Sequence, residues 1–432
     1  MTASSADRSN DFTRHLIDYG FEFFPTQISS ARGVSLRDVD GREYLDFTSG
    51  QMCAILGHNH PEIVAAIEKA CREALHLFSG MISVPVTGLS EDLAELLPEG
   101  LKKMMFLSTG AEANEAALRM AKLHTGGFEV AALTGSWHGM TAGVSSLTYA
   151  AGHRGYGPAM PGTMILPAPN SYRCPVRHCC GKCDMTCMEA GLAMLDAQSV
   201  GAPAAVIAEP VLSSAGVIVP PEGYFRRLKA ECEQRGMMLI LDEAQTALGR
   251  LGANFAFEIF DVVPDFVTLS KTLGGGLPMA AMITSTEIEA DCAEKGFMHV
   301  TSHVSDPLPA EVGRAVLRVL AAGQFNRRAR EMGAYLKAGL EELQTRHEAI
   351  GDVRGMGLMW GVELVKDRES RAPDPEYGAA VTRRCMELGL SMNIVWVGGM
   401  AAVWRIAPPL IITAEEIDRG LAIIDQAMSD MR

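Results

Sequence analysis

Between residues 104 and 285, short apolar runs alternate with stretches of helical spacing, and this alternation constrains the fold more than any other feature. The apolar runs cover residues 104–108, 128–133, 204–210, 237–244 and 265–271. Runs of this length between helices are typical of a buried, mostly parallel sheet. The sequence therefore predicts an α/β fold in which ligands bind at the carboxyl ends of the strands.

The flanking parts of the chain have a different pattern. Residues 34–47 have the character of a β-hairpin, residues 309–347 have helical spacing, and residues 351–365 resemble strands punctuated by glycine. A capping box from Thr413 to Glu416 marks the start of the last helix. We therefore expect an N-terminal segment that packs with a smaller α+β domain, beside a large domain. The expected ranges are 1–55 for the N-terminal segment, 56–320 for the large domain and 321–432 for the small domain.

Composition and charge argue against several classes of protein. The 432-residue chain has 38 basic and 52 acidic side chains, and its net charge of −14 disfavours binding to nucleic acid or to anionic membranes. No apolar run approaches the length that spans a bilayer, and the polar N-terminus lacks the apolar core of a signal peptide. We therefore expect a cytoplasmic protein with no nucleic-acid or membrane partner.

Three features that follow predicted strands together suggest a cofactor site. Residues 108–112 offer helix amides to a phosphate, although they also suit an ordinary capped helix. Asp242 follows a buried strand and needs a cationic partner, either an Arg or Lys of the fold or a protonated ring nitrogen. Lys271 ends another strand, where a desolvated amine is a good nucleophile unless it reaches solvent. A phosphate seat, an acid and an amine in one α/β unit are the equipment for pyridoxal phosphate.

Longer motifs resemble those of a known family. The stretches ILDEAQTALGR, PDFVTLSKTLGGGLP, LSTGAEANEAALRMAKL and SWHGMT resemble the class III (subgroup II) aminotransferases from about residue 20 to the end of the chain. Within that family, the blocks SGQM, HVSDPLPA and RIAPPL resemble the 2,2-dialkylglycine decarboxylases. The resemblance implies fold type I, pyridoxal phosphate as cofactor, and a homodimer or a tetramer built from two dimers.

The resemblance also implies roles for individual residues. Lys271 would form the Schiff base with the cofactor and then act as general acid and base, and Asp242 would keep the pyridine nitrogen protonated. Gln245 would bind the phenolic oxygen, and Trp137 would stack on the ring. The phosphate would be held by Thr109, Gly110 and Ala111, with Ser302 of the neighbouring subunit completing the cradle. Ser302 replaces the threonine that is usual in the family.

The implied reaction depends on how the substrate carboxylate is held. Gln51 and Arg405 would bind that carboxylate, and Met140 and Ser214 would line the side-chain pocket. The implied activity is decarboxylating transamination, in which a 2,2-dialkylglycine such as 2-aminoisobutyrate yields a ketone and CO2, with amino transfer to a 2-oxo acid such as pyruvate. An ω-aminotransferase that never decarboxylates is the alternative within the family.

The chain has three candidate sites for metal ions. The resemblance implies a K⁺ or Na⁺ ion at Leu77, Ser79, Ser302, Val304 and Asp306, and a more distant ion at Ala94, Leu97, Pro98 and Leu101. A cysteine cluster, which departs from the decarboxylase pattern, supplies candidate zinc ligands at Cys174, Cys179, Cys183 and Cys187. The same cysteines also suit reduced thiols or a reversible disulfide. A non-catalytic metal or redox sensor that uses this cluster is therefore an alternative from another class.

Overall fold

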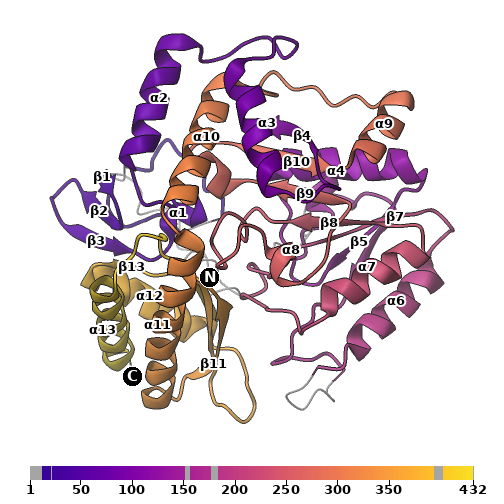
Figure 1. Ribbon diagram of the computed structural model, residues 1–432. Helices are drawn as coiled ribbons and strands as arrows, with labels where there is room; N and C mark the ends of the chain where they lie inside the picture. Colours follow the sequence, from indigo (N-terminus) through magenta and orange to yellow (C-terminus); the bar gives the residue numbers. More distant parts are fainter. Residues whose placement is uncertain (1–11, 21, 151–155, 177–182, 394–401, 432) are drawn as a thin grey trace.

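A seven-stranded sheet lies at the centre of the computed structural model, which describes residues 12–20, 22–150, 156–176, 183–393 and 402–431 (Figure 1). The strand order is β4-β10-β9-β8-β7-β5-β6. The strands are β4 (Lys103–Leu107), β5 (Glu129–Leu133), β6 (Thr163–Leu166), β7 (Pro203–Ala208), β8 (Met238–Asp242), β9 (Phe266–Leu269) and β10 (Ala280–Thr284).

Strand direction confirms the predicted, mostly parallel sheet. The pairs β5–β6, β5–β7, β7–β8 and β8–β9 are parallel, whereas both antiparallel pairs involve β10. Six strands therefore run in one direction, and the carboxyl ends of β4, β8 and β9 meet at one edge of the sheet. Three predicted strands were too long at their ends, and one of them is the run over 237–244, because β8 ends at Asp242. β7 stops at Ala208, before Pro210, which has no N–H to donate, and β9 stops at Leu269 because a 3₁₀ helix begins at Lys271.

Helices cover both faces of this sheet, and alternate strand residues supply the two cores. Val206 and Leu239 face a core with residues of α3 (Val84–Leu96), α6 (Thr186–Gln198), α7 (Tyr224–Gln234) and α10 (Pro307–Ala322). Ile207 and Ile240 face a core with residues of α4 (Gly110–Thr125) and α9 (Thr286–Glu294). Shorter helices and α2 complete the region: α1 (Ser49–Met52), α2 (Pro61–Glu73), α5 (Ala142–Ser145), α8 (Ala256–Ile259) and the 3₁₀ helix η2 (Lys271–Gly274). None of the described helices is long and apolar enough to span a membrane.

The two ends of the chain lie together beside the large sheet (Figure 1). The first sheet here consists of β1 (Ile28–Arg32), β2 (Ser35–Asp38), β3 (Glu43–Asp46) and β13 (Leu390–Ser391), and the second of β11 (Ile350–Met356), β12 (Met359–Leu364) and β14 (Val403–Ile406). β13 pairs with β3, so a C-terminal strand extends the N-terminal sheet. The helices are α11 (Phe325–Arg346), α12 (Pro375–Leu388) and α13 (Ala414–Asp430).

The capping box and the helical spacing predicted for this region correspond to helices in the structure. The capping box of Thr413 and Glu416 is present at the start of α13. The helical spacing over 309–347 corresponds to two helices, because α10 ends at Ala322 and Gln324 adopts a left-handed conformation before α11 begins. α10 runs two residues past the position where we expected the large domain to end.

Candidate active site

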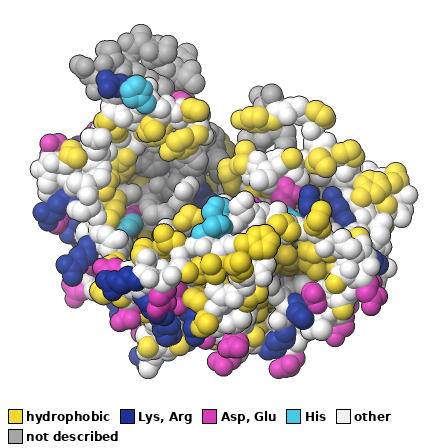
Figure 2. Space-filling view, turned by 90° about the horizontal axis from the view of Figure 1, so that it is seen from above, with side chains coloured by type: hydrophobic (Ala, Val, Ile, Leu, Met, Phe, Trp, Pro, Cys, Tyr) yellow, Lys and Arg dark blue, Asp and Glu magenta, His cyan; other side chains and the backbone are white. Residues whose placement is uncertain are grey.

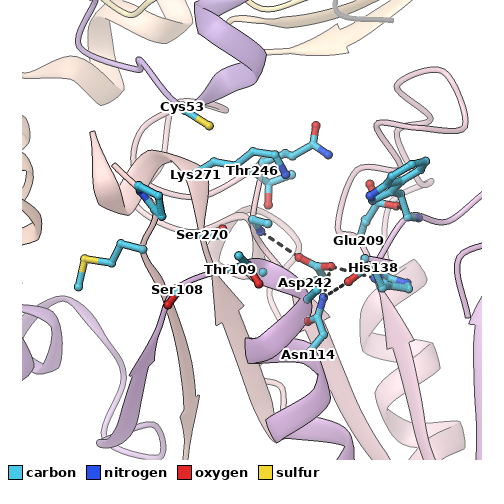
Figure 3. Close-up of a pocket in the computed structure, with 18 of the residues that line it drawn as sticks. Cys53, Ser108, Thr109, Asn114, His138, Glu209, Asp242, Thr246, Ser270 and Lys271 are labelled. Atoms are coloured by element: carbon cyan, nitrogen blue, oxygen red, sulfur yellow. Dashed lines mark hydrogen bonds and ion pairs between the residues drawn. The ribbon is translucent and has the colours of Figure 1, made fainter. Parts of the chain in front are cut away.

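A cavity of ≈ 360 Å³ opens at the carboxyl ends of β4, β8 and β9 (Figure 3). It brings together seven of the residues that the sequence marked for the cofactor. These are Thr109, Gly110, Ala111, Trp137, Asp242, Gln245 and Lys271. Because the three strands point the same way, residues that are far apart in the chain meet at one edge of the sheet.

Asp242 is a buried acid that the fold keeps ionised. It lies at the end of β8 and accepts hydrogen bonds from Nδ1 of His138 at 2.9 Å and from Nδ2 of Asn114 at 2.8 Å. Burial opposes ionisation, but the hydrogen bond and charge of His138 and the charge of Lys271 outweigh it and hold the pKa of Asp242 below its usual range. An anion at this position suits a protonated ring nitrogen.

Lys271 supplies the amine. It begins η2 directly after Ser270, its φ of 39° lies in the left-handed region, and its side chain reaches into the cavity (Figure 3). The structure gives its amine no hydrogen bond or ion pair with any described residue, so the nitrogen has no competing partner within the protein. The left-handed conformation of a non-glycine residue costs about 1–2 kcal/mol of conformational free energy, so the residue that supplies the amine has a strained backbone.

The N-terminus of α4 forms a phosphate seat at the same edge. Oγ1 of Thr109 accepts a hydrogen bond from the Glu112 amide at 3.3 Å, and the Glu112 carboxylate accepts one from the Thr109 amide at 3.1 Å. This reciprocal box holds the first turn and does not use the amides of Gly110 and Ala111. A Cβ on Gly110 would lie 3.3 Å from the Ser270 side chain, so glycine keeps this approach open. Free amides at a helix N-terminus bind phosphate well.

Glu209 lines the same cavity, and its charge acts on Arg405, which is described next. Its carboxylate accepts hydrogen bonds from the amide of Trp137 at 2.8 Å and from the amide of Ser213 at 3.1 Å. Burial raises the pKa of Glu209 to about 7, against the opposing charge of His138. The residue therefore changes charge near neutral pH.

Arg405 is a buried cation on β14. Its Nη1 donates hydrogen bonds to Oγ of Ser213 at 3.1 Å and to Oγ of Ser214 at 3.4 Å. Burial lowers the pKa of Arg405 to about 10, while the charge of Glu209 acts in the opposite direction. Arg405 has no ion pair with a described residue, and it is buried and lies outside the cavity lining. A guanidinium without an ion-pair partner suits a carboxylate.

Gln51 is presented by a left-handed turn of four residues. The φ angles are 50° at Ser49, 53° at Gly50, 63° at Gln51 and 68° at Met52. Asp46 accepts a hydrogen bond from the Gly50 amide at 3.1 Å, and Oγ of Ser49 donates to the carbonyl of Ala407. Nη2 of the fully buried Arg250 donates to Oγ of Ser49 at 3.2 Å. The Gln51 side chain is exposed and does not line the cavity, although Cys53, two residues later, does.

The remaining predicted residues lie away from the cavity in this chain. Met140 and Ser302 are exposed and outside the cavity lining, and the half-buried Ser214 beside Arg405 also lies outside it. The carbonyls of Ala94 and Leu97 accept hydrogen bonds from Nζ of Lys102 at 2.7 and 3.0 Å, so an ammonium group lies where the more distant ion was expected. Of the other expected ion ligands, Leu77, Ser79 and Val304 are half-buried, and Oγ of Ser79 donates to the carbonyl of Thr301 at 3.1 Å.

The cysteine cluster is only partly within the described residues. Cys187 is buried, Cys174 and Cys183 are half-buried, and Cys179 lies outside the described residues. Burial raises the pKa of the Cys187 thiol, and the thiols of Cys183 and Cys174 raise it further.

Two residues of the site, Asn114 and Glu209, were not predicted, although the sequence contains a signal for each. Asn114 is a polar residue on the otherwise apolar, buried face of the predicted helix that starts at residue 110. Glu209 follows a buried strand just as Asp242 does. In each case the signal is a polar side chain where burial demands a partner.

Comparison with known proteins agrees with this geometry. The model of the class-III aminotransferases matches residues 19–428. An uncharacterized aminotransferase of Schizosaccharomyces pombe is 48% identical over 97% of this chain and 94% of its own, and a leucine/methionine racemase of Thermococcus litoralis is 34% identical over 95% and 92%. A PLP-bound amine transaminase from an uncultivated Pseudomonas species superposes with a TM-score of 0.89 at 27% identity, over 96% of this chain and 98% of its own.

These relatives decide between the alternatives only in part. They overturn the alternative of a non-catalytic metal or redox sensor, because the family consists of enzymes. None of the three is named as a dialkylglycine decarboxylase. The two that are named as an aminotransferase and an amine transaminase favour plain transamination over the decarboxylating reaction. The chain belongs to the class-III aminotransferases and is a pyridoxal phosphate-dependent enzyme of fold type I.

Proposed function

We propose that this enzyme transfers an amino group from a primary amine or an amino acid to a 2-oxo acid. The observation that carries the proposal is the meeting of the Lys271 amine and the ionised Asp242 at one cavity. The resemblance to an amine transaminase supports this choice of reaction.

The residues of the cavity fit pyridoxal phosphate. The amides of Gly110 and Ala111 would bind the phosphate, the carboxylate of Asp242 would bind the ring nitrogen, and Nζ of Lys271 would bind the aldehyde carbon. When bound, the cofactor supplies a protonated ring that draws electrons from the substrate. Nζ of Lys271 would then move a proton at the substrate carbon, while Asp242 remains ionised and holds the ring nitrogen in its protonated form.

Arg405 would orient the 2-oxo acid. Its guanidinium is held by Ser213 and Ser214 and lacks an ion-pair partner among the described residues, so a planar carboxylate would complete its hydrogen bonds. Glu209 would tune this interaction, since its charge acts on Arg405 and changes near pH 7.

A second subunit would complete the site. Ser302 lies outside the cavity of its own chain, in keeping with a role across a dimer interface. Exposed hydrophobic side chains gather on the hollowed face seen from above, as an interface requires (Figure 2). The exposed hydrophobic side chains of the described residues include Phe78, Met81, Ile82, Val84, Met298 and Val300. The proposed assembly is therefore a homodimer in which Ser302 of the partner subunit reaches the phosphate.

Decarboxylation is a second candidate, and Gln51 favours it. Four left-handed residues are a costly way to present one amide side chain, and strain of this kind is concentrated at functional sites. The amide of Gln51, together with Arg405, would hold a substrate carboxylate in one of two positions, only one of which aligns the carboxylate bond for cleavage.

One substrate panel tests both candidates. With pyruvate as acceptor, plain transamination predicts alanine from primary amines and no CO2 from 2-aminoisobutyrate. The second candidate predicts equal amounts of CO2, acetone and alanine from 2-aminoisobutyrate. D-Alanine formed from L-alanine without an acceptor would instead reveal a racemase and would contradict both.

Lys271 provides a separate test of the cofactor linkage. Borohydride reduction should fix the cofactor to the wild-type protein, and the Lys271→Ala variant should bind it without being fixed. Lys295→Ala is the control, because Lys295 is a surface lysine that pairs with Asp291. Fixation in the Lys271→Ala variant would refute the assignment.

A further inference from the structure

His76, His303 and Asp306 form a cluster in a second cavity of ≈ 350 Å³. One carboxylate oxygen of Asp306 bonds Nδ1 of His76 and the other bonds Nδ1 of His303, each at 2.6 Å. One ring nitrogen of each histidine and one carboxylate oxygen of Asp306 all lie within 4.8 Å of one another. Among the residues that the structure describes, no other group of three His, Cys, Asp or Glu side chains meets this condition.

The local fold directs Asp306 at the two histidines. Asp306 is the N-cap residue of α10, yet its side chain makes no capping hydrogen bond. Its side chain is 9% exposed, whereas those of His76 and His303 are 49% and 65% exposed. Within one chain, the carboxylate therefore forms the floor of the site, and the two imidazoles form its more exposed walls.

An alkali ion does not fit these residues as they stand. Such an ion requires oxygen ligands, but both oxygens of Asp306 are bound to imidazole nitrogens, and Oγ of Ser79 donates to a backbone carbonyl. At the more distant place, the Lys102 ammonium already binds the carbonyls of Ala94 and Leu97. The alkali ion expected at Leu77, Ser79, Ser302, Val304 and Asp306 would therefore have to compete with two imidazoles for the carboxylate of Asp306.

We propose that His76, His303 and Asp306 bind a transition-metal dication of the zinc class. Two imidazole nitrogens with one carboxylate oxygen suit Zn²⁺, Co²⁺ or Ni²⁺ better than a hard alkali ion. Three protein ligands on an open floor leave a fourth position for water, which is the pattern of an accessible zinc site rather than a closed structural one.

The cluster needs only small movements to close around a metal. With bonds of about 2.0–2.1 Å, the ligand atoms of a tetrahedral zinc ion lie about 3.3 Å apart. The observed hydrogen bonds are shorter than this separation, and the widest pair is at most 4.8 Å apart. Both imidazoles are exposed and can rotate, while the more buried carboxylate stays in place.

The proposed metal site adjoins the cofactor cavity. Ser108, Leu277, Pro278 and Met279 line both cavities. Ser108 also belongs to the strand end that leads into the phosphate seat, and its amide donates to Glu112 at 2.9 Å. Binding of a metal would therefore affect the phosphate seat. Metal binding itself does not depend on the reaction that the enzyme catalyses.

Cobalt(II) gives a readout that is independent of activity. The holoenzyme, freed of metals with a chelator, should bind one Co²⁺ per chain and show visible d–d absorption. The variants His303→Gln and Asp306→Asn should bind it more than about tenfold more weakly, because even the loss of an outer-shell partner has an effect of that size. His124→Gln is the matched control, since Nδ1 of His124 bonds Asp291 at 2.7 Å without a second imidazole.

The wild-type protein alone provides a second measurement if a variant fails to fold. X-ray absorption of the zinc-loaded holoenzyme should show nitrogen and oxygen at about 2.0–2.1 Å and no sulfur at about 2.3 Å. Sulfur in the first shell would place the metal at the cysteine cluster and refute the proposal. Equal Co²⁺ affinity in the wild type and in the His303→Gln variant, or no binding at all, would refute it as well.

Discussion

Asp242 depends on neighbours that hold its carboxylate by hydrogen bonds. Asn114 donates to its carboxylate and to the carbonyl of His138, and its own oxygen accepts a hydrogen bond from Oγ1 of Thr268 at 2.6 Å. A hydrogen bond to a charged group contributes about 1.5–3 kcal/mol. We therefore expect Asn114→Ala to weaken binding of pyridoxal phosphate about tenfold or more, measured by absorbance titration of the apoprotein.

The control for this variant is Asn59→Ala. Asn59 also donates one side-chain hydrogen bond, to the carbonyl of Ala31 at 2.9 Å, but on the surface and far from Asp242. Its removal should leave cofactor affinity unchanged. If the two variants bind the cofactor equally well, Asn114 does not support the charge of Asp242.

Glu209 should impose a pH dependence on the use of 2-oxo acids. Below pH 7 its carboxyl is neutral and leaves the charge of Arg405 to the substrate, and above pH 7 its anion competes with the substrate. We expect KM for pyruvate to rise as the pH increases through about 7. Glu209→Gln should flatten this profile, because its amide cannot ionise.

Stability should follow the same titration with a defined sign. The folded state holds a proton on Glu209 up to about pH 7, whereas the ordinary glutamate value is 4.5, so this stabilising contribution is complete below pH 4.5 and is lost as the pH rises through about 7.

Glu243→Gln is the control for KM. Burial also raises the pKa of Glu243 to about 7, but Glu243 accepts hydrogen bonds from the amides of Ala256 and Phe257 and does not face Arg405. An unchanged pyruvate profile in Glu209→Gln would contradict the assignment.

At the scale of whole elements, two capping boxes of equal chemistry separate stability from function. Thr109 caps α4 at the phosphate seat, and Thr413 caps α13 on the other side of the molecule, each accepting a hydrogen bond at 3.3 Å from the amide three residues later. Thr109→Ala and Thr413→Ala should each lower stability by about 1 kcal/mol. Only Thr109→Ala should raise the Kd of pyridoxal phosphate, measured by equilibrium dialysis. A similar loss of affinity in both variants would show that the cap acts only through stability.

At the left-handed turn of α1, we expect one substitution to give a higher melting temperature than another. Glycine accepts a φ of 63° without the cost that an L-residue bears there, which is about 1–2 kcal/mol. We expect the Gln51→Gly variant to melt about 1–2 °C above Gln51→Ala, although both lose the amide and both lose activity towards substrates that carry a carboxylate. Differential scanning calorimetry measures the difference. Equal melting temperatures would show that the turn stores no strain at Gln51.

The sequence predicted those parts of the fold and site in which chemistry and pattern coincide. Asp242 and Lys271 end apolar runs, so their position at the edge of the sheet followed from the parallel strands. The turn at Gln51 could not be predicted, because only Gly50 among its four residues favours a left-handed backbone. The contact of Asn114 with Asp242 joins residues 128 positions apart, a distance that no local pattern spans.

At the scale of the whole molecule, Arg250 shows how separate regions are held together around the site. Its fully buried guanidinium donates to Ser49 in the N-terminal part of the chain, and to the carbonyls of Leu358 and Pro408 in the C-terminal part. A planar group with five donors can bridge three elements in this way, whereas a lysine cannot. The turn that presents Gln51 is therefore fixed by the packing of the chain's two ends on the large sheet, and not by its own sequence.

The exposed hydrophobic side chains predict that the chain forms a dimer. The side chains of Val84 and Val300 are 78% and 72% exposed, and Val300 lies two residues before Ser302. Glutamate at either position would have to be desolvated in a dimer, at a cost of several kcal/mol. Val84→Glu and Val300→Glu should therefore give monomers in sedimentation velocity, and these monomers should bind pyridoxal phosphate more weakly because Ser302 of the partner subunit is lost. Val200→Glu is the control, since Val200 is 77% exposed on the loop between α6 and β7 and should leave the dimer intact. Monomers that keep full cofactor affinity would show that the phosphate seat of α4 is complete within one chain.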